Sequence, residues 1–377
     1  MRYWRSLAGF SLAATIGAAT VSPLPSAAMD AYEIEPAYKE FPLKGPAAAT
    51  GLVIWNHGVN GTKMQYQYPP PLLAMGLAAH GWDVIKLDRN PTYENNWSNA
   101  GQRHVERLIE EAKTQAQAGY SRIILAGQSY GGAIALAAAD SVRVYAVVAM
   151  APGIGTTARG YSGVVTDQDS YSIAQHTYTQ AEALQVDRAV FVLAPDDELA
   201  PNIDRAPHVR GLMEAKSIPF MVVDRDVHGH SAGYSKDFNP YAGCAQFMLD
   251  PSLTFKPGEF KCYRDDAKPV LAALDLDLAG AQRAWLGYGD GNGQPIVIVE
   301  RSGPGGLTVD SGWGVDLAGR AKPGKLLALP AHLEGDTLRF DLHGAVAVKI
   351  DGVRALMTET KTDPTKPFVA ALRQILP

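Results

Sequence analysis

The sequence predicts an α/β fold, a mostly parallel sheet with helices on both faces, followed by a small β-rich C-terminal domain. Over residues 51–249, apolar runs alternate with helix-compatible segments. These runs are continuously apolar rather than alternating, which is typical of strands buried on both faces. Beyond residue 249 the pattern changes to short β-like runs separated by Gly, Asp or Pro. We therefore expect a first domain at residues 29–270 and a second at residues 283–377.

Six apolar runs bounded by turn signals are the expected strands of the sheet. They span residues 51–58, 82–88, 121–127, 144–150, 188–195 and 218–224. Between them, residues 102–117 place apolar side chains on one helical stripe, and residues 131–140 are small and apolar all round. Such alternation predicts right-handed crossovers between parallel strands. Functional groups then lie on the loops at the carboxyl ends of the strands.

Two segments depart from this alternation. The connection at residues 152–187 is longer and more polar than the others. Long loops in compact domains are often lids or binding loops, so a lid and a solvated surface excursion both remain open. Residues 283–377 contain the runs PIVIVE, LLALPAHL, DTLRFDLHG and AVAVKIDG. Short β-like runs of this kind indicate a small antiparallel sheet or barrel.

The first 28 residues have the anatomy of a secretory signal peptide. The charged start MRYWR precedes a small, apolar stretch and a small-residue site that ends at Ala28. The apolar stretch is short for a membrane anchor, which needs about 20 residues. No later segment is apolar enough to cross a bilayer, so we expect an exported protein, periplasmic or secreted. The formal charge of −5, without a Lys/Arg cluster, argues against nucleic-acid binding.

The chain contains only two cysteines, Cys244 and Cys262. In an exported protein, a pair this close in sequence favours a disulfide worth about 3 kcal/mol in the chain-entropy model. Two free buried thiols are the alternative. A glycine-rich stretch at residues 287–295 raises the question of calcium, but Arg301 stands where an EF-hand loop needs an acid. We expect neither a metal nor an organic cofactor.

A Gly-x-Ser-x-Gly motif follows the third apolar run, with Ser129 between Gly127 and Gly131. The run ends at residue 126 and a helix can begin at Tyr130, the context that a nucleophile elbow requires. The nucleophile of an elbow has strained dihedral angles, and side chains at the two glycines would collide with the neighbouring strand and helix. Ser129 is therefore the candidate nucleophile. The backbone N–H of Tyr130 would face the developing oxyanion.

A serine hydroxyl needs a base to take its proton, and the candidates follow the sixth apolar run. His228 and His230 both lie in the stretch VVDRDVHGHSAGYSKDF. We favour His230, because Gly229 precedes it and a helix-like segment follows it. For His228, the alternative is a loop histidine that shapes the backbone.

The base in turn needs a carboxylate that fixes its tautomer and stabilises the imidazolium. Acidic residues follow the fifth apolar run, and we favour Asp197 over Asp196 because Pro201 comes four positions after it. Asp196 would then be a turn-forming residue. The predicted order along the chain is Ser129, Asp197, His230.

The first apolar run ends in His57 and Gly58, and the backbone N–H of Val59 is the candidate second oxyanion donor. His57 itself is expected to be structural. His176, within the possible lid, is a candidate substrate contact. Four aromatic residues are candidates for the lining of an acyl pocket: Tyr66, Tyr68, Tyr93 and Trp97.

With these motifs in this order, residues 51–250 resemble an α/β-hydrolase, and most of all the dienelactone-hydrolase-like and exported serine esterase branch. The resemblance rests on HGVNG, GQSYGG, PDDELAP and HGH. Dienelactone hydrolases use cysteine at the elbow, where this chain has Ser129, so the resemblance implies general ester hydrolysis rather than a lactone-specific role. The implied reaction on a small-molecule ester passes through an acyl-enzyme. A peptidase or amidase with the same triad, or a non-catalytic binding protein on a hydrolase scaffold, are the alternatives.

Overall fold

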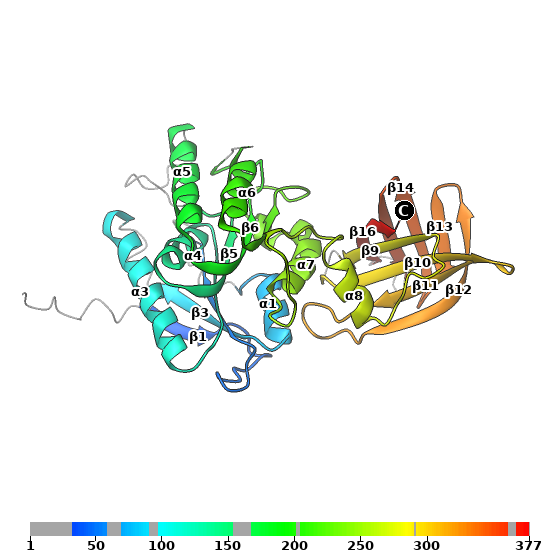
Figure 1. Ribbon diagram of the computed structural model, residues 1–377, viewed down its shortest axis with the longest axis horizontal. Helices are drawn as coiled ribbons and strands as arrows, with labels where there is room; N and C mark the ends of the chain where they lie inside the picture. The colour runs from blue at the N-terminus through cyan, green and yellow to red at the C-terminus, as the bar shows by residue number, and fades with distance from the viewer. Residues whose placement is uncertain are drawn as a thin grey trace, which may run out of the picture.

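The computed structural model of the protein describes residues 32–58, 69–89, 97–153, 167–200, 204–289, 292–360 and 367–376. The expected signal peptide lies outside these residues. Figure 1 shows an α/β domain beside a domain made of strands, which contains the C-terminus. The predicted fold class, an α/β domain followed by a β-rich domain, is confirmed.

An eight-stranded sheet forms the centre of the first domain, in the order β1-β3-β2-β4-β5-β6-β7-β8. Its strands are β1 (Tyr32–Pro36), β2 (Leu52–Asn56), β3 (Asp83–Arg89), β4 (Ile123–Gln128), β5 (Val144–Met150), β6 (Val186–Val192), β7 (Pro219–Val223) and β8 (Gly258–Glu259). Strand β1 is antiparallel to β3, and every other pairing is parallel. The six predicted strands are β2 to β7, so their carboxyl ends lie at one edge of the sheet.

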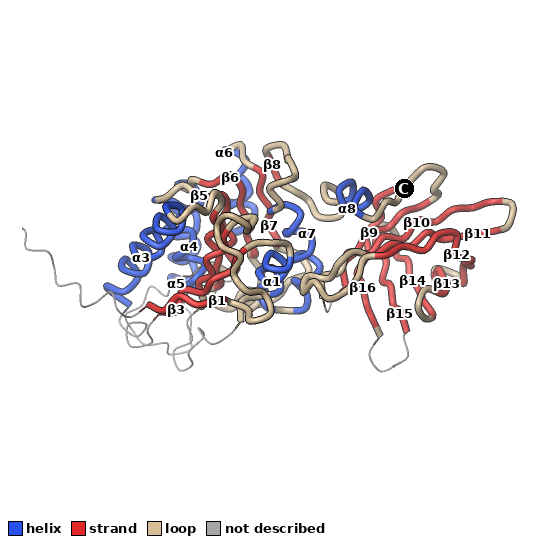
Figure 2. The backbone as a smooth tube through the Cα atoms, turned by 90° about the horizontal axis from the view of Figure 1, so that it is seen from below, coloured by secondary structure: helices blue, strands red, loops and turns tan. Residues whose placement is uncertain are grey.

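Helices cover both faces of this sheet (Figure 2). One face packs against α3 (Trp97–Gln117), α4 (Tyr130–Ser141), α5 (Asp167–Ala183) and α6 (Arg205–Lys216). The other packs against α1 (Leu72–Ala79) and α7 (Asn239–Leu249). The continuous apolar runs of the central strands follow from this arrangement, because each strand contributes side chains to both layers.

The C-terminal domain is a closed barrel of eight antiparallel strands. They are β9 (Arg283–Gly289), β10 (Pro295–Gly303), β11 (Gly306–Trp313), β12 (Gly324–Glu334), β13 (Thr337–Asp341), β14 (Ala345–Asp351), β15 (Arg354–Thr360) and β16 (Phe368–Leu376). Each strand pairs with the next in sequence, and β16 closes the barrel on β9. The interior is an apolar cluster that includes Trp285, Phe340 and Met357.

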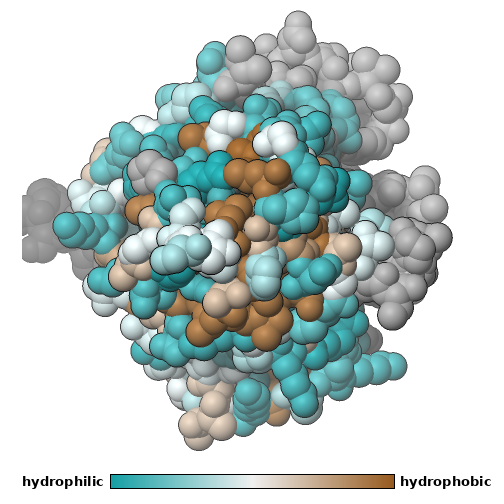
Figure 3. Space-filling model, turned by 90° about the vertical axis from the view of Figure 1, so that its right-hand side faces the viewer, coloured by the Kyte–Doolittle hydropathy of each residue, from teal (hydrophilic) through white to brown (hydrophobic). Residues whose placement is uncertain are grey.

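Five large apolar side chains of the barrel are exposed: Leu326, Leu327, Leu333, Val353 and Leu356. On the side of the barrel that points away from the α/β domain, apolar residues gather among hydrophilic ones (Figure 3).

The two domains share packed side chains. Tyr288 of β9 is fully buried in the same apolar cluster as α7, and a Cβ atom on Gly243 would lie 2.5 Å from its ring. Cys244 of α7 forms a disulfide with Cys262, so α7 is tied to the segment that leads to α8 (Ala267–Ala273) and the barrel. Among the residues described, no helix is long and apolar enough to cross a membrane.

Candidate active site

Ser129 lies in the turn between β4 and α4, with a φ of 56° and a ψ of −125°. This left-handed backbone is strained for a residue with a side chain. The chain can make the turn because its neighbours are glycines. A Cβ atom on Gly131 would lie 2.1 Å from the carbonyl oxygen of Asn56, and one on Gly127 would lie 2.4 Å from the carbonyl carbon of Gly131. The turn therefore holds the serine at the carboxyl edge of the sheet, as the motif predicts.

His230 and Asp197 reach Ser129 from the loops after β7 and β6. The His230 Nε2 atom lies 2.7 Å from Ser129 Oγ, and its Nδ1 atom lies 2.9 Å from Asp197 Oδ1. Ser129 and His230 are each 8% exposed, and Asp197 is fully buried. Each ring nitrogen of His230 thus faces one partner, so this imidazole is placed to receive a proton from the serine while the carboxylate fixes its tautomer.

The loop after β6 holds the histidine loop through three consecutive acidic residues. Asp196 accepts hydrogen bonds from the backbone N–H of Gly229, at 3.0 Å, and lies 3.0 Å from the His228 Nδ1 atom. Glu198 accepts the backbone N–H of His230 at 2.7 Å. His228 and Asp196 are exposed, and this second His–Asp pair does not contact Ser129. The acidic residues therefore fix the position of the loop as well as that of the His230 ring.

The charge on Asp197 is stabilised from several sides. Burial alone would raise its pKa, but the hydrogen bond and charge of His230, the charge of Arg205 and the backbone N–H of Leu199 together lower the pKa below its usual value. The Asp197 Oδ1 atom accepts the Leu199 N–H at 2.9 Å and the Ala200 N–H at 3.3 Å. The carboxylate therefore stays ionised beside the imidazole.

Arg205 is a site residue that sequence reasoning missed. It is the first residue of α6, it is 1% exposed, and its Nη1 atom lies 3.5 Å from Asp197 Oδ2. Arginine is common on the exposed surfaces of helices, and the stretch RAPHVR contains nothing that marks this one as buried. Only the packing of α6 against α5 and the loop after β5 reveals it.

The predicted oxyanion donors are described only in part. Tyr130 begins α4, so its backbone N–H belongs to the first turn of that helix. The Tyr130 side chain points away to α3, where its hydroxyl lies 2.7 Å from His104 Nδ1. Val59 lies outside the described residues, as do Tyr66, Tyr68 and Tyr93. The adjacent His57 is buried, with its Nδ1 atom 2.7 Å from the Gly58 carbonyl oxygen.

The possible lid at residues 152–187 is described in part, because residues 154–166 are outside the described set. Residues 167–183 form α5, whose Ala174, Tyr178 and Ala181 belong to the core that covers the sheet. His176 is half-buried on this helix, with its Nε2 atom 2.5 Å from the Gln180 side chain. Burial lowers the pKa of His176. This half of the segment is a helix of the domain core, and a role as a lid stays a prediction for the rest.

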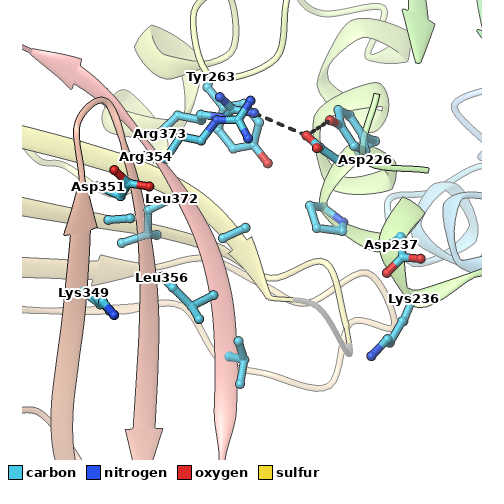
Figure 4. A pocket seen from close by; sticks show the side chains of 15 residues that line it. Asp226, Lys236, Asp237, Tyr263, Lys349, Asp351, Arg354, Leu356, Leu372 and Arg373 are labelled. Atoms are coloured by element: carbon cyan, nitrogen blue, oxygen red, sulfur yellow. Dashed lines mark hydrogen bonds and ion pairs between the residues drawn. The ribbon is translucent and has the colours of Figure 1, made fainter. Parts of the chain in front are cut away.

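A cavity of about 540 Å³ lies between the two domains and is separate from the triad (Figure 4). One wall comes from the loop after β7 and the start of α7, and the other from β14, β15 and β16 of the barrel. Arg373 of the barrel reaches across and places its Nη2 atom 3.4 Å from Asp226 Oδ2. Tyr241 donates to the same carboxylate oxygen at 3.2 Å. The barrel thus contacts the loop that carries His230.

The strand order, the strained serine turn and the chain order of Ser129, Asp197 and His230 define the class of the first domain: it has the α/β-hydrolase fold. No family model matches the chain, and no curated protein matches its sequence.

Solved structures with a similar fold include three hydrolases. A puromycin-hydrolysing peptidase of Mycobacterium tuberculosis is 13% identical, with a TM-score of 0.44, over 61% of this chain and 38% of the peptidase. A sugar hydrolase from Lactococcus lactis is 15% identical, with a TM-score of 0.44, over 59% of this chain and 95% of that protein. An esterase of Pyrococcus furiosus is 16% identical, with a TM-score of 0.39, over 54% and 82%. The match spans little more than a third of the peptidase, and these activities are those of the similar proteins.

Proposed function

We propose that the protein is an exported serine hydrolase that cleaves carboxylic esters through an acyl-enzyme. The observation that carries the proposal is the continuous chain of contacts from Ser129 Oγ to His230 Nε2, at 2.7 Å, and from His230 Nδ1 to Asp197, at 2.9 Å. Ser129 itself lies on a strained turn at the carboxyl edge of the sheet. Each group has the neighbour that nucleophilic catalysis requires.

In the proposed mechanism, His230 takes the proton of Ser129 as the hydroxyl attacks the ester carbonyl. The buried Asp197 stabilises the resulting imidazolium. The N–H of Tyr130, with that of Val59 as the second proposed donor, stabilises the oxyanion, and the loss of one such donor typically costs about 3 kcal/mol. His230 then protonates the leaving alcohol, and water repeats the sequence to release the acid.

The strained backbone of Ser129 supports catalysis over a structural role for this serine. A serine that only formed a turn would gain nothing from a φ of 56° and two flanking glycines without room for a Cβ atom. Strain of this kind costs of order 1–3 kcal/mol and persists where the surrounding structure enforces it. Export is supported by the disulfide between Cys244 and Cys262, since such bonds persist in oxidising compartments. The dienelactone-hydrolase-like branch remains a prediction.

The test is a fluorophosphonate probe applied to the purified protein, together with p-nitrophenyl esters of short and long acyl chains. We expect the wild type to be labelled and to hydrolyse at least one ester, and Ser129→Ala to lose both activities. A folded wild-type protein that resists the probe would overturn the proposal and favour a non-catalytic binding protein. Labelling without ester turnover, combined with cleavage of peptide or amide substrates, would assign the same triad to a peptidase or amidase.

A further inference from the structure

We propose that Arg205 is a positioning residue of the triad. Its side chain braces the loop of Asp197 against the turn that carries Ser129. The inference rests on the proposed function, because it assigns Arg205 a role within the same Ser–His–Asp triad.

From the first turn of α6, Arg205 contacts both the loop of Asp197 and the loop after β5. Its Nη1 atom forms an ion pair with Asp197 Oδ2 at 3.5 Å. Its Nη2 atom donates to the carbonyl oxygen of Pro152, in the loop after β5, and to Thr177 Oγ1 of α5 at 3.2 Å. One guanidinium therefore joins three segments that the chain separates: the acid loop, the loop after β5, and α5.

The loop after β5 in turn holds the nucleophile. The backbone N–H of Gly153 donates to the Ser129 carbonyl oxygen at 3.1 Å, and the Ser129 N–H donates to the Met150 carbonyl oxygen at 2.8 Å. Pro152, the acceptor for Arg205, lies between these two residues. A displacement of the guanidinium would therefore move the nucleophile and the carboxylate relative to each other, and 1 Å of misplacement is enough to slow a reaction about 100-fold.

Burial of the Arg205 charge carries a desolvation cost. Burial lowers the pKa of Arg205, and the negative charge of Asp197 offsets that effect. An apolar pair at such positions often leaves a protein equally stable, so a buried ion pair is weak evidence for a role in stability. What a guanidinium supplies here, and an apolar side chain does not, is a positive charge on the side of Asp197 opposite His230.

The experiment follows the His230 Nδ1–H proton that faces Asp197, by NMR of full-length protein labelled with ¹⁵N-histidine. We expect Arg205→Met to shift or remove this resonance, and to lower kcat for an ester by about 10- to 100-fold with little change in KM, because the triad groups move relative to each other. Arg205→Lys keeps the charge but not the fork, so it should restore only part of the resonance and of kcat. Arg210→Met is the matched control, since Arg210 is also an ion-paired arginine of α6 but contacts Asp224 and Glu259. Its resonance and kcat should match those of the wild type.

A double variant separates positioning of the carboxylate from a general loss of structure. In the Asp197→Asn background the carboxylate that Arg205 holds is gone, so Arg205→Met should lower kcat by a smaller factor than it does in the wild type. This double variant also keeps the test possible if the single one fails to fold, because it leaves no unpaired carboxylate. An unchanged resonance and kcat in Arg205→Met, or the same fold-loss of kcat in both backgrounds, would overturn the inference. The resonance does not depend on turnover, so a protein that hydrolyses no ester would refute the proposed function while the resonance still decides the role of Arg205.

Discussion

Two His–Asp pairs lie side by side on the loops after β6 and β7. The pair His230–Asp197 is buried and contacts Ser129, whereas His228–Asp196 is exposed and points to solvent. Their distances are almost equal, 2.9 Å and 3.0 Å, so hydrogen-bond length does not distinguish them. Burial distinguishes the two pairs, and so does the contact with Ser129. Only a buried imidazole beside the serine hydroxyl can take its proton.

The first prediction compares the two histidines. On the proposed mechanism, His230→Ala should lower kcat for an ester by roughly 10³-fold or more, because Ser129 loses its proposed base. His228→Ala should retain most of the activity, since its ring serves only the exposed part of the loop. Steady-state kinetics on one p-nitrophenyl ester, with circular dichroism to check folding, measure both. The reverse order would show that the base has been wrongly assigned.

The carboxylates form the matching pair of variants. Asp197→Asn should reduce kcat by roughly 10³–10⁴-fold while the protein stays folded, because the amide no longer fixes the tautomer of His230. Asp196→Asn should have a small effect, since an amide oxygen can still accept the N–H of Gly229. Equal losses for the two variants would contradict the assignment of Asp197.

The second prediction concerns the glycine behind the nucleophile. Gly131→Ala should destabilise the fold by more than about 3 kcal/mol, because its Cβ would sit 2.1 Å from the Asn56 carbonyl oxygen and the backbone would have to move. Gly211→Ala is the control: this exposed glycine of α6 has nothing within 4 Å of its Cβ position. That change should stabilise the protein by about 0.5–1 kcal/mol. Urea denaturation of both variants gives the comparison, and a neutral Gly131→Ala would refute the steric account.

At the scale of single residues, the role of a residue can be predicted from sequence where its type and its local pattern have one main physical explanation. Glycines on both sides of Ser129, and a histidine and an acid just past apolar runs, are such cases, and the structure brings those three side chains together. Arg205 is the opposite case. Nothing local distinguishes a buried arginine from a surface one, because its environment is made by α5 and the loop after β5, both distant along the chain.

At the scale of elements, apolar runs predicted the six central strands because each is buried on both faces. Several elements of the sheet domain were not predicted, among them β1 and α1. Strand β1, with the sequence YEIEP, is an edge strand with alternating charged residues, so it has no apolar run. Helix α1, with the sequence LLAMGLAA, is apolar on all sides and lies between the sheet domain and the barrel residue Leu317. A helical period in the sequence identifies a helix that buries one face and exposes the other. Helix α1 is apolar all round, so its sequence shows no such period.

The third prediction belongs to the contact between α8 and β9. Asp266 precedes α8, is fully buried, and accepts the hydroxyl hydrogen bond of Tyr288. Burial raises its pKa from 3.8 to about 6, although the hydrogen bond from Tyr288 acts in the opposite direction. A raised pKa means that the folded state holds the proton more tightly than the unfolded state. The stability from this group is complete below about pH 4 and is lost as the pH rises through about 6.

Asp266→Asn removes this titration. We expect the variant to gain stability relative to the wild type between pH 4 and pH 7, by on the order of 2–3 kcal/mol, because the amide needs no proton to stay neutral. Asp265→Asn is the control, since Asp265 is a more exposed neighbour whose carboxylate pairs with Arg264. Thermal or urea denaturation at the two pH values measures the difference. A constant difference between variant and wild type across this range would rule out the titration.

At the scale of the whole molecule, the barrel and the α/β domain are joined by more than a linker. Tyr288 packs into the core beneath α7, the disulfide ties α7 to the connecting segment, and Arg373 reaches the histidine loop through Asp226. Asp226 has a left-handed backbone with a φ of 57° and lies four residues before His230 in the same loop. A contact that holds Asp226 therefore helps to hold the loop of His230.

The fourth prediction follows from that support. Arg373→Met should lower kcat by about 2- to 10-fold, because the histidine loop loses a contact that holds it. Its melting temperature should change little, since half-exposed ion pairs contribute about 0–1 kcal/mol. Arg354→Met is the control, as it removes a cation from the same cavity wall (Figure 4) without touching Asp226. Equal kinetics for the two variants would show that the barrel does not support the loop.

The closure of the barrel has a consequence for the order in which the protein matures. Strand β16 is the last of the barrel strands along the chain, and it pairs with β9, the first strand of the barrel, as well as with β15. It also carries Arg373, which reaches the histidine loop. A nascent chain that emerges without β16 has two open sheet edges and a histidine loop that lacks one of its contacts. Synthesis of β16 is then the step at which the two open edges of the barrel pair and the histidine loop gains its contact with Arg373.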